Sequence, residues 1–316
     1  MDLFKEILKG NKVALAKGIT LLESSLETDI ISSQELISNC LPHSGDSIRI
    51  GITGIPGVGK STFIETFGKI LTEKGKKVAV LAIDPTSEKT HGSILGDKSR
   101  MNKLAVDENA FIRPSPSSGT LGGVSSKTRD SIILCEAAGF DVILIETVGV
   151  GQSETIVNTI CDFFLLLMLA GAGDELQGIK RGIMELADMV VITKSDGDNL
   201  QKANNAKQEY QMALHLFPAS ENGWTPKVSV CSALEDTGIK DIWETISTYN
   251  QQMISNNYKD ENRKKQDVYW LHHIIKEDLG NKKYNSLILE GKLDELETKL
   301  KKGGTIKQLL EGLSIY

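Results

Sequence analysis

The hydrophobic pattern of the chain is dominated by short, continuous apolar runs separated by amphipathic stretches. Such runs are typical of strands that are buried on both faces of a parallel sheet. They predict strands at 48–53, 78–83, 141–146, 163–169, 189–193 and 227–231. Apolar residues at helical spacing lie between several of these runs, at 124–139, 152–160, 176–187 and 200–216. The alternation predicts an α/β fold with a doubly wound, mostly parallel sheet, in which ligands bind at the carboxyl ends of the strands.

Helical patterns also flank this alternating core at both ends of the chain. Residues 1–45 predict an N-terminal helical extension that packs on the main domain. The charged stretch 258–267 predicts a solvated boundary after the central domain at 46–257. Short helices are expected in the C-terminal arm, residues 258–316, whose apolar stripes need a partner. We expect a second copy of the chain to cover them, so that the protein is a homodimer. The alternative is that the arm folds back on its own domain.

Composition and charge exclude several classes of protein. Of the 316 residues, 40% are hydrophobic and 25% are charged, and the net charge is −6, which argues against a basic face for nucleic acid or an anionic membrane. The longest apolar run, 163–172, is about half as long as a membrane span requires. The first ten residues lack the pattern of a signal peptide, so we expect a cytoplasmic protein. The scattered cysteines predict buried thiols without disulfides or zinc: Cys40, Cys135, Cys161 and Cys231.

The first predicted strand runs directly into a glycine-rich loop, GIPGVGKS, and then into a predicted helix. The loop has the complete G-x-x-x-x-G-K-[ST] spacing, in which backbone N–H groups and the helix dipole attract phosphate. The candidate nucleotide-binding residues here are Gly54, Ile55, Pro56, Gly57, Val58, Gly59, Lys60, Ser61 and Thr62. Lys60 is expected to reach the β- and γ-phosphates and to act in catalysis, and the Ser61 hydroxyl is expected to ligate Mg²⁺. A glycine-rich turn without a ligand is the alternative reading.

Carboxylates follow the next two strands of the predicted sheet. Asp84 comes directly after 78–83 and is a candidate ligand of Mg²⁺, although Asp-Pro also commonly opens a turn. Glu146 ends the strand 141–146 and is a candidate for supporting the metal or the attacking water. Gly149 follows, and its N–H is a candidate contact of the γ-phosphate; Gln152 is a candidate for orienting the water.

Two glycine- and serine-containing stretches, 91–101 and 113–130, follow the second strand. The prolines, serines and glycines of 113–123 predict irregular structure there. Long loops inside a compact domain are usually functional, so both stretches are candidates for segments that respond to the nucleotide.

The strand 189–193 is followed by a pattern that selects guanine. Thr193, Lys194 and Asp196 complete a [NT]-K-x-D motif, in which the Asp196 carboxylate can accept both the N1–H and the 2-amino group of guanine. Lys194 is expected to lay its methylenes along the base. A backbone N–H that contacts the guanine carbonyl is expected after strand 227–231, within Ser232, Ala233 and Leu234. We therefore expect bound GTP or GDP.

Several longer strings resemble one family closely. The chain resembles the methylmalonyl-CoA mutase-associated GTPases, also called the MeaB/ArgK family. The strings that carry the resemblance are GIPGVGKS, AIDPTS (82–87), GSILGDKSRM (92–101), RPSPSSGTLGGV (113–124), ETVGVGQSE (146–154), GAGDELQGIKRGIMELAD (171–188) and KSDGDN (194–199). The resemblance covers roughly residues 45–250. It implies a homodimeric metallochaperone that hydrolyses GTP, gates cofactor loading of an adenosylcobalamin-dependent mutase and protects or reactivates that enzyme. A cobalamin adenosyltransferase is a further candidate partner.

The resemblance also implies roles for residues that spacing alone does not assign. Asp84, Asp97 and Glu146 would be the carboxylates that hold the metal or position water, with Asp97 a candidate for catalysis as well. The segment from Asp174 to Lys180 would be a switch that signals to the mutase, and Lys180 is a candidate catalytic residue within it. Members of the family usually carry Asn at the position of Thr193, which implies weaker binding of guanine by this chain while Asp196 preserves selectivity.

Three alternatives remain open at this stage. The ArgK name implies a kinase of a transport system, but no segment of the sequence predicts a lid that binds a phosphoryl acceptor. A nickel-insertion GTPase would commonly carry a histidine- or cysteine-rich stretch. Here the five histidines cluster only as the pair His272 and His273. A targeting GTPase of the signal-recognition type would need a methionine-rich module, and the seven methionines are dispersed.

Overall fold

The computed structural model describes residues 2–83, 101–114, 121–147, 153–171, 181–218, 220–302 and 306–311. In these residues the chain forms a seven-stranded sheet in the order β3-β2-β4-β1-β5-β6-β7. The strands are β1 (Ile48–Gly54), β2 (Val78–Ile83), β3 (Ala110–Arg113), β4 (Val142–Thr147), β5 (Phe163–Leu169), β6 (Met189–Thr193) and β7 (Lys227–Val230). Every neighbouring pair is parallel. The predicted fold class is confirmed, and all six predicted strands are present.

Two details of the middle of the chain differ from the sequence prediction. The strand β3 was not predicted, because four residues next to a charged turn give no hydrophobic period; it pairs with β2 in the register Val78 to Ala110. The stretch 113–123 was predicted to be irregular, and this was wrong at both ends. Arg113 ends β3, and α7 (Leu121–Ala137) already begins at Leu121 despite two glycines in its first turn. Residues 115–120 of that stretch lie outside the described residues.

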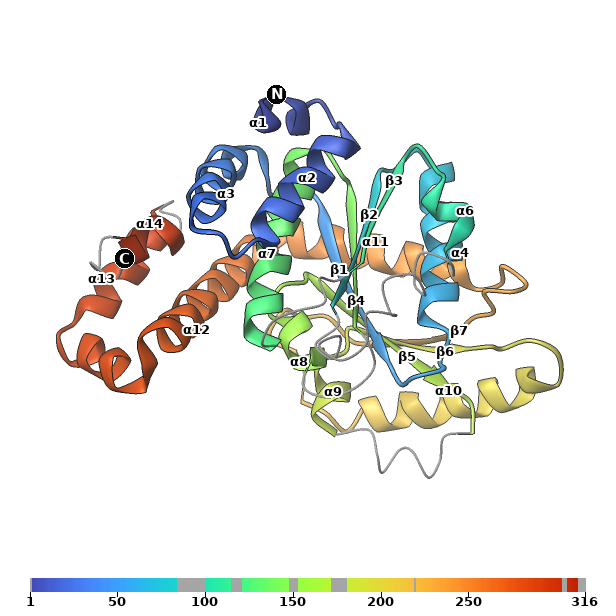
Figure 1. Cartoon of the computed structure of the whole chain (residues 1–316). Coiled ribbons are helices and arrows are strands. Elements are labelled where there is room, and N and C mark those ends of the chain that lie inside the picture. Colours follow the sequence, from blue (N-terminus) through green and yellow to red (C-terminus); the bar gives the residue numbers. More distant parts are fainter. Residues whose placement is uncertain are drawn as a thin grey trace. The chain divides into compact units, whose positions relative to one another are not determined.

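Helices cover both faces of the sheet (Figure 1). On one side of the central strands lie α7 and α8 (Ser153–Asn158), and on the other lie α4 (Lys60–Glu73) and α6 (Asn102–Ala105). Further along the chain come α9 (Arg181–Leu186), α10 (Leu200–Leu214), which packs on β6 and β7, and α11 (Ile239–Ser255). The strands are almost entirely buried, as continuous apolar runs require.

The N-terminal helices pack on α7. These are α1 (Leu3–Leu8), α2 (Lys12–Glu23) and α3 (Glu27–Cys40), and all three contact α7. The linker into β1 is held by Glu136 of α7, whose carboxylate accepts from the Gly45 N–H at 2.9 Å and from the Ser47 hydroxyl at 2.7 Å. The same carboxylate pairs bidentately with Arg49, with both N···O distances 2.9 Å. These hydrogen bonds attach the start of β1 to α7.

The chain divides into two compact units, Met1–Met253 and Ile254–Tyr316. The second contains α12 (Tyr258–Leu289), α13 (Lys292–Lys301) and α14 (Ile306–Glu311). The charged stretch 258–267, which was predicted as a solvated boundary after the central domain, forms the helical start of α12. Gly280, with φ 71° and ψ 163°, divides α12 into two helical segments. His272 joins them: its Nδ1 lies 2.7 Å from the Tyr284 hydroxyl, and its Nε2 lies 2.9 Å from a Glu297 oxygen of α13.

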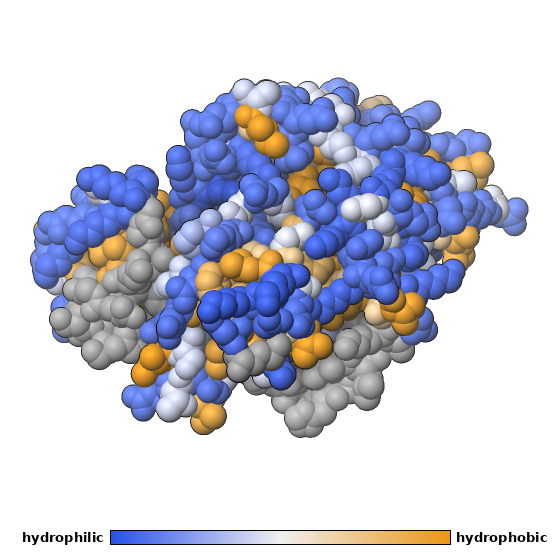
Figure 2. Space-filling model, turned by 90° about the horizontal axis from the view of Figure 1, so that it is seen from above, coloured by the Kyte–Doolittle hydropathy of each residue, from blue (hydrophilic) through white to orange (hydrophobic). Residues whose placement is uncertain are grey.

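The exposed face drawn in Figure 2 is mostly hydrophilic, with hydrophobic residues in small separate groups. In the described parts of the chain, no helix is both long enough and apolar enough to cross a bilayer. The four cysteines are buried thiols, as predicted. Burial raises the pKa of the Cys40 thiol to about 11 and that of Cys231 to about 12, so neither is a reactive thiolate at neutral pH.

Candidate functional site

The glycine-rich loop joins the carboxyl end of β1 to the start of α4. Gly54 lies so close to β5 that a Cβ there would be 2.5 Å from the carbonyl oxygen of Leu167, so only glycine fits without displacing backbone. Gly57 and Gly59 have φ of +80° and +96°, in the left-handed region that favours glycine. Gly59 caps α4 without a side-chain hydrogen bond. The first-turn N–H groups of a 14-residue helix therefore face the loop, which is the arrangement that attracts an anion.

Lys60 lies over the same loop. Its ammonium donates to the carbonyl oxygens of Gly54 at 2.7 Å and Ile55 at 3.2 Å. The positive charge and the helix N-terminus thus meet at one place, where both favour a phosphate. The structure brings the predicted loop residues together as the spacing of the motif requires.

The carboxyl end of β4 lies beside the start of α4. The Ser61 hydroxyl donates to a Glu146 carboxylate oxygen at 3.2 Å, and Glu146 is only 5% exposed. Next to it, the Thr147 hydroxyl donates to the Thr53 hydroxyl at 2.8 Å and ties the ends of β4 and β1 together. A serine hydroxyl and a carboxylate are hard oxygen donors of the kind that Mg²⁺ prefers. The described residues therefore fit the predicted metal.

The residues after β6 hold the glycine-rich loop from the other side. The buried Thr193 hydroxyl donates to the Val58 carbonyl at 2.7 Å and lies 3.2 Å from the carbonyl of Met168. Lys194 extends across the loop, and its ammonium donates to the Gly57 carbonyl at 2.8 Å. Lys194 has φ of 55°, a strained value for a residue with a side chain. Strain of this kind persists where surrounding contacts fix the backbone, and here Ser195 donates its N–H to the Cys231 carbonyl at 3.0 Å.

Asp196 lies against the turn that follows β7. The fully buried Ser232 donates its hydroxyl to an Asp196 carboxylate oxygen at 2.5 Å and accepts from the Glu235 N–H at 3.2 Å. Ser232 and Thr237 exchange backbone hydrogen bonds of 3.1 Å, which closes the turn. Leu234, at its tip, is 79% exposed. The structure thus joins the two segments that the sequence assigned to guanine.

Five predicted site residues, together with the proposed switch segment from Asp174 to Lys180, lie outside the described residues, so the structure says nothing of them. The five residues are Asp84, Asp97, Gly149, Gln152 and Lys180.

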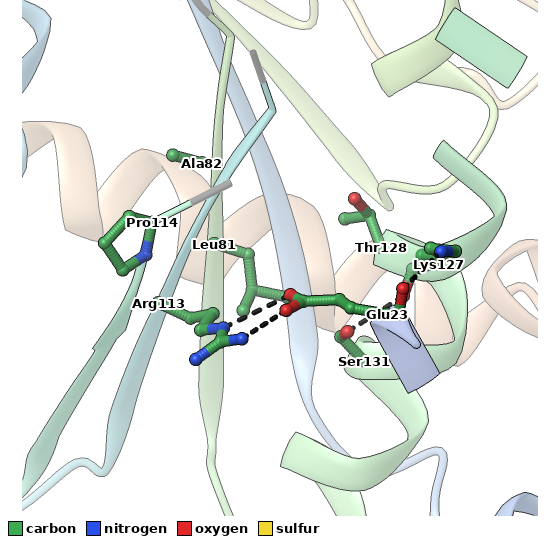
Figure 3. A pocket seen from close by; sticks show the side chains of 8 residues that line it. All are labelled: Glu23, Leu81, Ala82, Arg113, Pro114, Lys127, Thr128 and Ser131. Atoms are coloured by element: carbon green, nitrogen blue, oxygen red, sulfur yellow. Dashed lines mark hydrogen bonds and ion pairs between the residues drawn. The ribbon is translucent and has the colours of Figure 1, made fainter. Parts of the chain in front are cut away.

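A small pocket lies at the carboxyl ends of β2 and β3, beside α7 (Figure 3). Glu23, the last residue of α2, pairs there with Arg113, whose Nε lies 3.2 Å from one carboxylate oxygen. The Lys127 ammonium donates to the Glu23 carbonyl at 2.7 Å. The charged groups of this pocket therefore fasten the N-terminal helices to β3 and α7. Sequence reasoning did not find them, because the contacts span about 90 residues or more.

Thr66 is a second residue that sequence reasoning missed. It lies on α4, and its hydroxyl donates to the Ala233 carbonyl at 3.1 Å, across 167 positions of the chain. The contact links the helix of the phosphate loop directly to the turn beside Asp196. A threonine on the half-buried side of a helix carries no signal in the sequence that distinguishes it from a residue that only packs.

Comparisons with known proteins agree with this geometry. The sequence model of the family described as methylmalonyl Co-A mutase-associated GTPase MeaB matches residues 15–287. A putative GTPase of Caulobacter vibrioides is 46% identical over 94% of this chain and 91% of its own length. The GTPase ArgK of Escherichia coli is 47% identical over 88% of this chain and 84% of its length. The mitochondrial methylmalonic aciduria type A homolog of Mus musculus is 46% identical over 88% of this chain and 69% of its own length.

A solved structure covers nearly the whole chain. The crystal structure of an LAO/AO transport system kinase matches with a TM-score of 0.78 and 36% sequence identity, over 99% of this chain and 97% of that one. The match supports the P-loop fold of the first unit.

Proposed function

Because the chain belongs to the family of methylmalonyl Co-A mutase-associated GTPases MeaB, we propose that this GTPase is a chaperone of an adenosylcobalamin-dependent methylmalonyl-CoA mutase. In this role it gates the loading of the cobalamin cofactor and protects or reactivates the mutase. The family match and the relative with methylmalonic aciduria in its name support the choice of partner. A cobalamin adenosyltransferase is a further proposed partner.

The observation that carries the nucleotide chemistry is the set of contacts that ties the phosphate loop to the base-reading segments. Thr193 and Lys194 bond the carbonyls of Val58 and Gly57, so the loop and the segment after β6 form one rigid frame. In this frame Lys60 and the first turn of α4 bind the phosphates. Asp196, oriented by Ser232, accepts from guanine, and adenine offers no matching donors.

Ser61 and Glu146 would hold the metal ion, together with Asp84 and Asp97 as proposed ligands from the sequence. When bound there, Mg²⁺ would supply positive charge that neutralises the charge developing on the phosphates during hydrolysis. Glu146 also supports the attacking water. Gln152 orients this water and Gly149 contacts the γ-phosphate in the proposal, and Lys180 couples hydrolysis to the partner.

The test is GTP turnover by the purified chain, with and without a methylmalonyl-CoA mutase from the same organism. We expect slow turnover alone and faster turnover with the mutase. A matched assay with Lys60→Ala should show no turnover in either condition. Turnover that does not respond to the mutase at any ratio of the two proteins would contradict the proposed partnership, while leaving the GTPase activity intact.

A kinase of a transport system is a second candidate, since the solved relative is described as an LAO/AO transport system kinase. The two functions differ in where the γ-phosphate goes. A GTPase releases it as inorganic phosphate, whereas a kinase transfers it to a protein acceptor. Turnover with γ-labelled GTP and a cell extract, followed by electrophoresis, separates them: label retained on a protein band would favour the kinase.

We further propose that the protein is a homodimer held by the C-terminal arm. The support is three exposed apolar side chains of α12: Tyr269, Ile288 and Leu289 are 45%, 50% and 89% exposed. Burying such side chains between two copies removes apolar surface from water. Light scattering of the full chain is expected to give a dimer, and Leu289→Glu is expected to shift it toward the monomer. A dimer mass that does not change would place the interface elsewhere.

A further inference from the structure

We infer that Thr66 is a positioning residue for base recognition: its hydroxyl orients the turn after β7 so that a backbone N–H of that turn meets the carbonyl oxygen of guanine. The inference rests on the proposed guanine specificity and deepens it. Thr66 lies on α4, and its hydroxyl donates to the Ala233 carbonyl at 3.1 Å. This hydrogen bond connects the turn to the helix, whereas the other hydrogen bonds between the turn and the described residues involve Ile192, Ser195, Asp196 or residues of the turn itself.

The turn is anchored to the sheet at its base. Cys231 donates its N–H to the Ile192 carbonyl at 2.8 Å, and the Ser232 hydroxyl bonds Asp196 at 2.5 Å. Gly238 follows the turn, and a Cβ there would lie only 2.3 Å from the Val230 carbonyl oxygen. Only glycine fits at this position, so the backbone at the end of the turn packs directly on the end of β7. These contacts fix the ends of the turn. They leave the peptide between Ala233 and Leu234, at its tip, to be fixed by Thr66.

The rigidity of the peptide unit explains what this one contact achieves. The carbonyl of Ala233 and the N–H of Leu234 belong to the same planar unit and point in opposite directions. A hydroxyl that holds the carbonyl toward α4 therefore directs the Leu234 N–H away from that helix. In the part of the chain that the structure describes, the N–H groups of Ala233 and Leu234 have no hydrogen-bond partner. Two available donors thus lie in the turn whose first residue, Ser232, bonds the carboxylate of Asp196, and a guanine carbonyl requires such a donor.

Through Thr66, the helix α4 links the phosphate loop to the turn after β7. The helix begins at the phosphate loop, at Gly59, and Thr66 lies about two turns further on. The same rigid helix therefore contacts the proposed phosphate site with its first turn and the base-reading turn with its side chain. The distance between these two parts of the nucleotide site is set by α4.

The experiment compares affinities for three nucleotides in the full-length chain, measured by calorimetry with Mg²⁺. GDP has every recognition group, 6-thio-GDP replaces the carbonyl oxygen by a weakly accepting sulfur, and IDP lacks the 2-amino group that Asp196 reads. Thr66→Val keeps the shape of the side chain and removes the hydroxyl. Thr66→Ser keeps the hydroxyl, and Thr245→Val makes the same change on α11, where the hydroxyl donates to Asp241 of its own helix.

We expect Thr66→Val to bind GDP about fivefold more weakly, which corresponds to one ordinary hydrogen bond. Its preference for GDP over 6-thio-GDP should fall by the same factor, and its preference for GDP over IDP should not change. Thr66→Ser and Thr245→Val should behave as wild type. Equal weakening toward all three nucleotides, or no weakening, would overturn the positioning role. A wild-type chain that binds ADP as tightly as GDP would instead refute the proposed guanine specificity itself.

Discussion

The contact between Thr193 and the phosphate loop gives a sharp prediction for Thr193→Val. Valine has the shape of threonine without the hydroxyl, so the change leaves the packing intact and removes the donor to the Val58 carbonyl. The Thr193 side chain is buried, with the two oxygens 2.7 Å apart, so the carbonyl would lose its partner without gaining water. Leaving a buried acceptor unsatisfied costs about 1–3 kcal/mol of stability.

The loss should also reach nucleotide affinity, because the loop is then no longer held in place before the nucleotide arrives. Ordering the backbone of one residue costs about 1–2 kcal/mol, and each 1.4 kcal/mol is about tenfold in affinity. We therefore expect GDP to bind about 5- to 30-fold more weakly to Thr193→Val.

Thr72→Val provides the matched control for this measurement. Thr72 is also a buried threonine with two acceptors, the Lys69 carbonyl at 3.0 Å and the Asp107 carboxylate at 2.8 Å, but it lies at the far end of α4. Urea unfolding should show a similar loss of stability in both variants, and calorimetry should show weaker GDP binding in Thr193→Val alone. If the two variants bind GDP equally well, the reasoning about loop preorganisation is wrong.

Three further predictions follow from the site and the core. Asp196→Asn should weaken GDP binding on the order of 100-fold, through two lost charge-assisted hydrogen bonds, and favour xanthosine diphosphate in a competition assay; an unchanged order of preference would remove the guanine assignment. Lys60→Ala should abolish GTP turnover while the circular dichroism spectrum stays that of the wild type; residual turnover would mean that another residue makes the essential contact with the phosphates. Burial raises the pKa of Asp188 from 3.8 to about 7, so wild-type stability should fall as the pH rises through this range. Asp188→Asn should remove that loss, about 1.4 kcal/mol per pH unit in urea unfolding, and parallel pH curves for the two proteins would contradict it.

The glycine-rich loop is held by a strained residue that the surrounding structure fixes. Lys194 keeps a left-handed backbone because its ammonium bonds Gly57 and its neighbour Ser195 is held by the sheet. Strain of this kind is stored where the surrounding structure determines the backbone. The bonds from Thr193 and Lys194 also hold the glycine-rich loop, and a loop held by the protein's own contacts needs less binding energy to be ordered.

The sequence by itself determined the elements and the identity of the main binding loop. Continuous apolar runs predicted six of the seven strands found among the described residues, because a strand buried on both faces must be apolar at every position. The spacing from Gly54 to Ser61 predicted the phosphate loop, because only glycine tolerates these backbone angles beside another strand. Asp196 and the segment from Ser232 to Leu234 were both predicted to contact guanine, because ligands bind at the carboxyl ends of the strands, and the structure joins the two by a hydrogen bond.

Only the tertiary structure decided the contacts that join these parts. The edge strand β3 is too short to show a period, and it becomes a strand through its hydrogen bonds with β2. The bonds from Thr66 to Ala233 and from Arg113 to Glu23 connect residues far apart in the chain, and a single threonine or arginine in the sequence carries no sign of its partner. Local patterns specify an element because they depend on the backbone's own period. A contact between elements depends on how all of them pack, and that information is distributed over the whole chain.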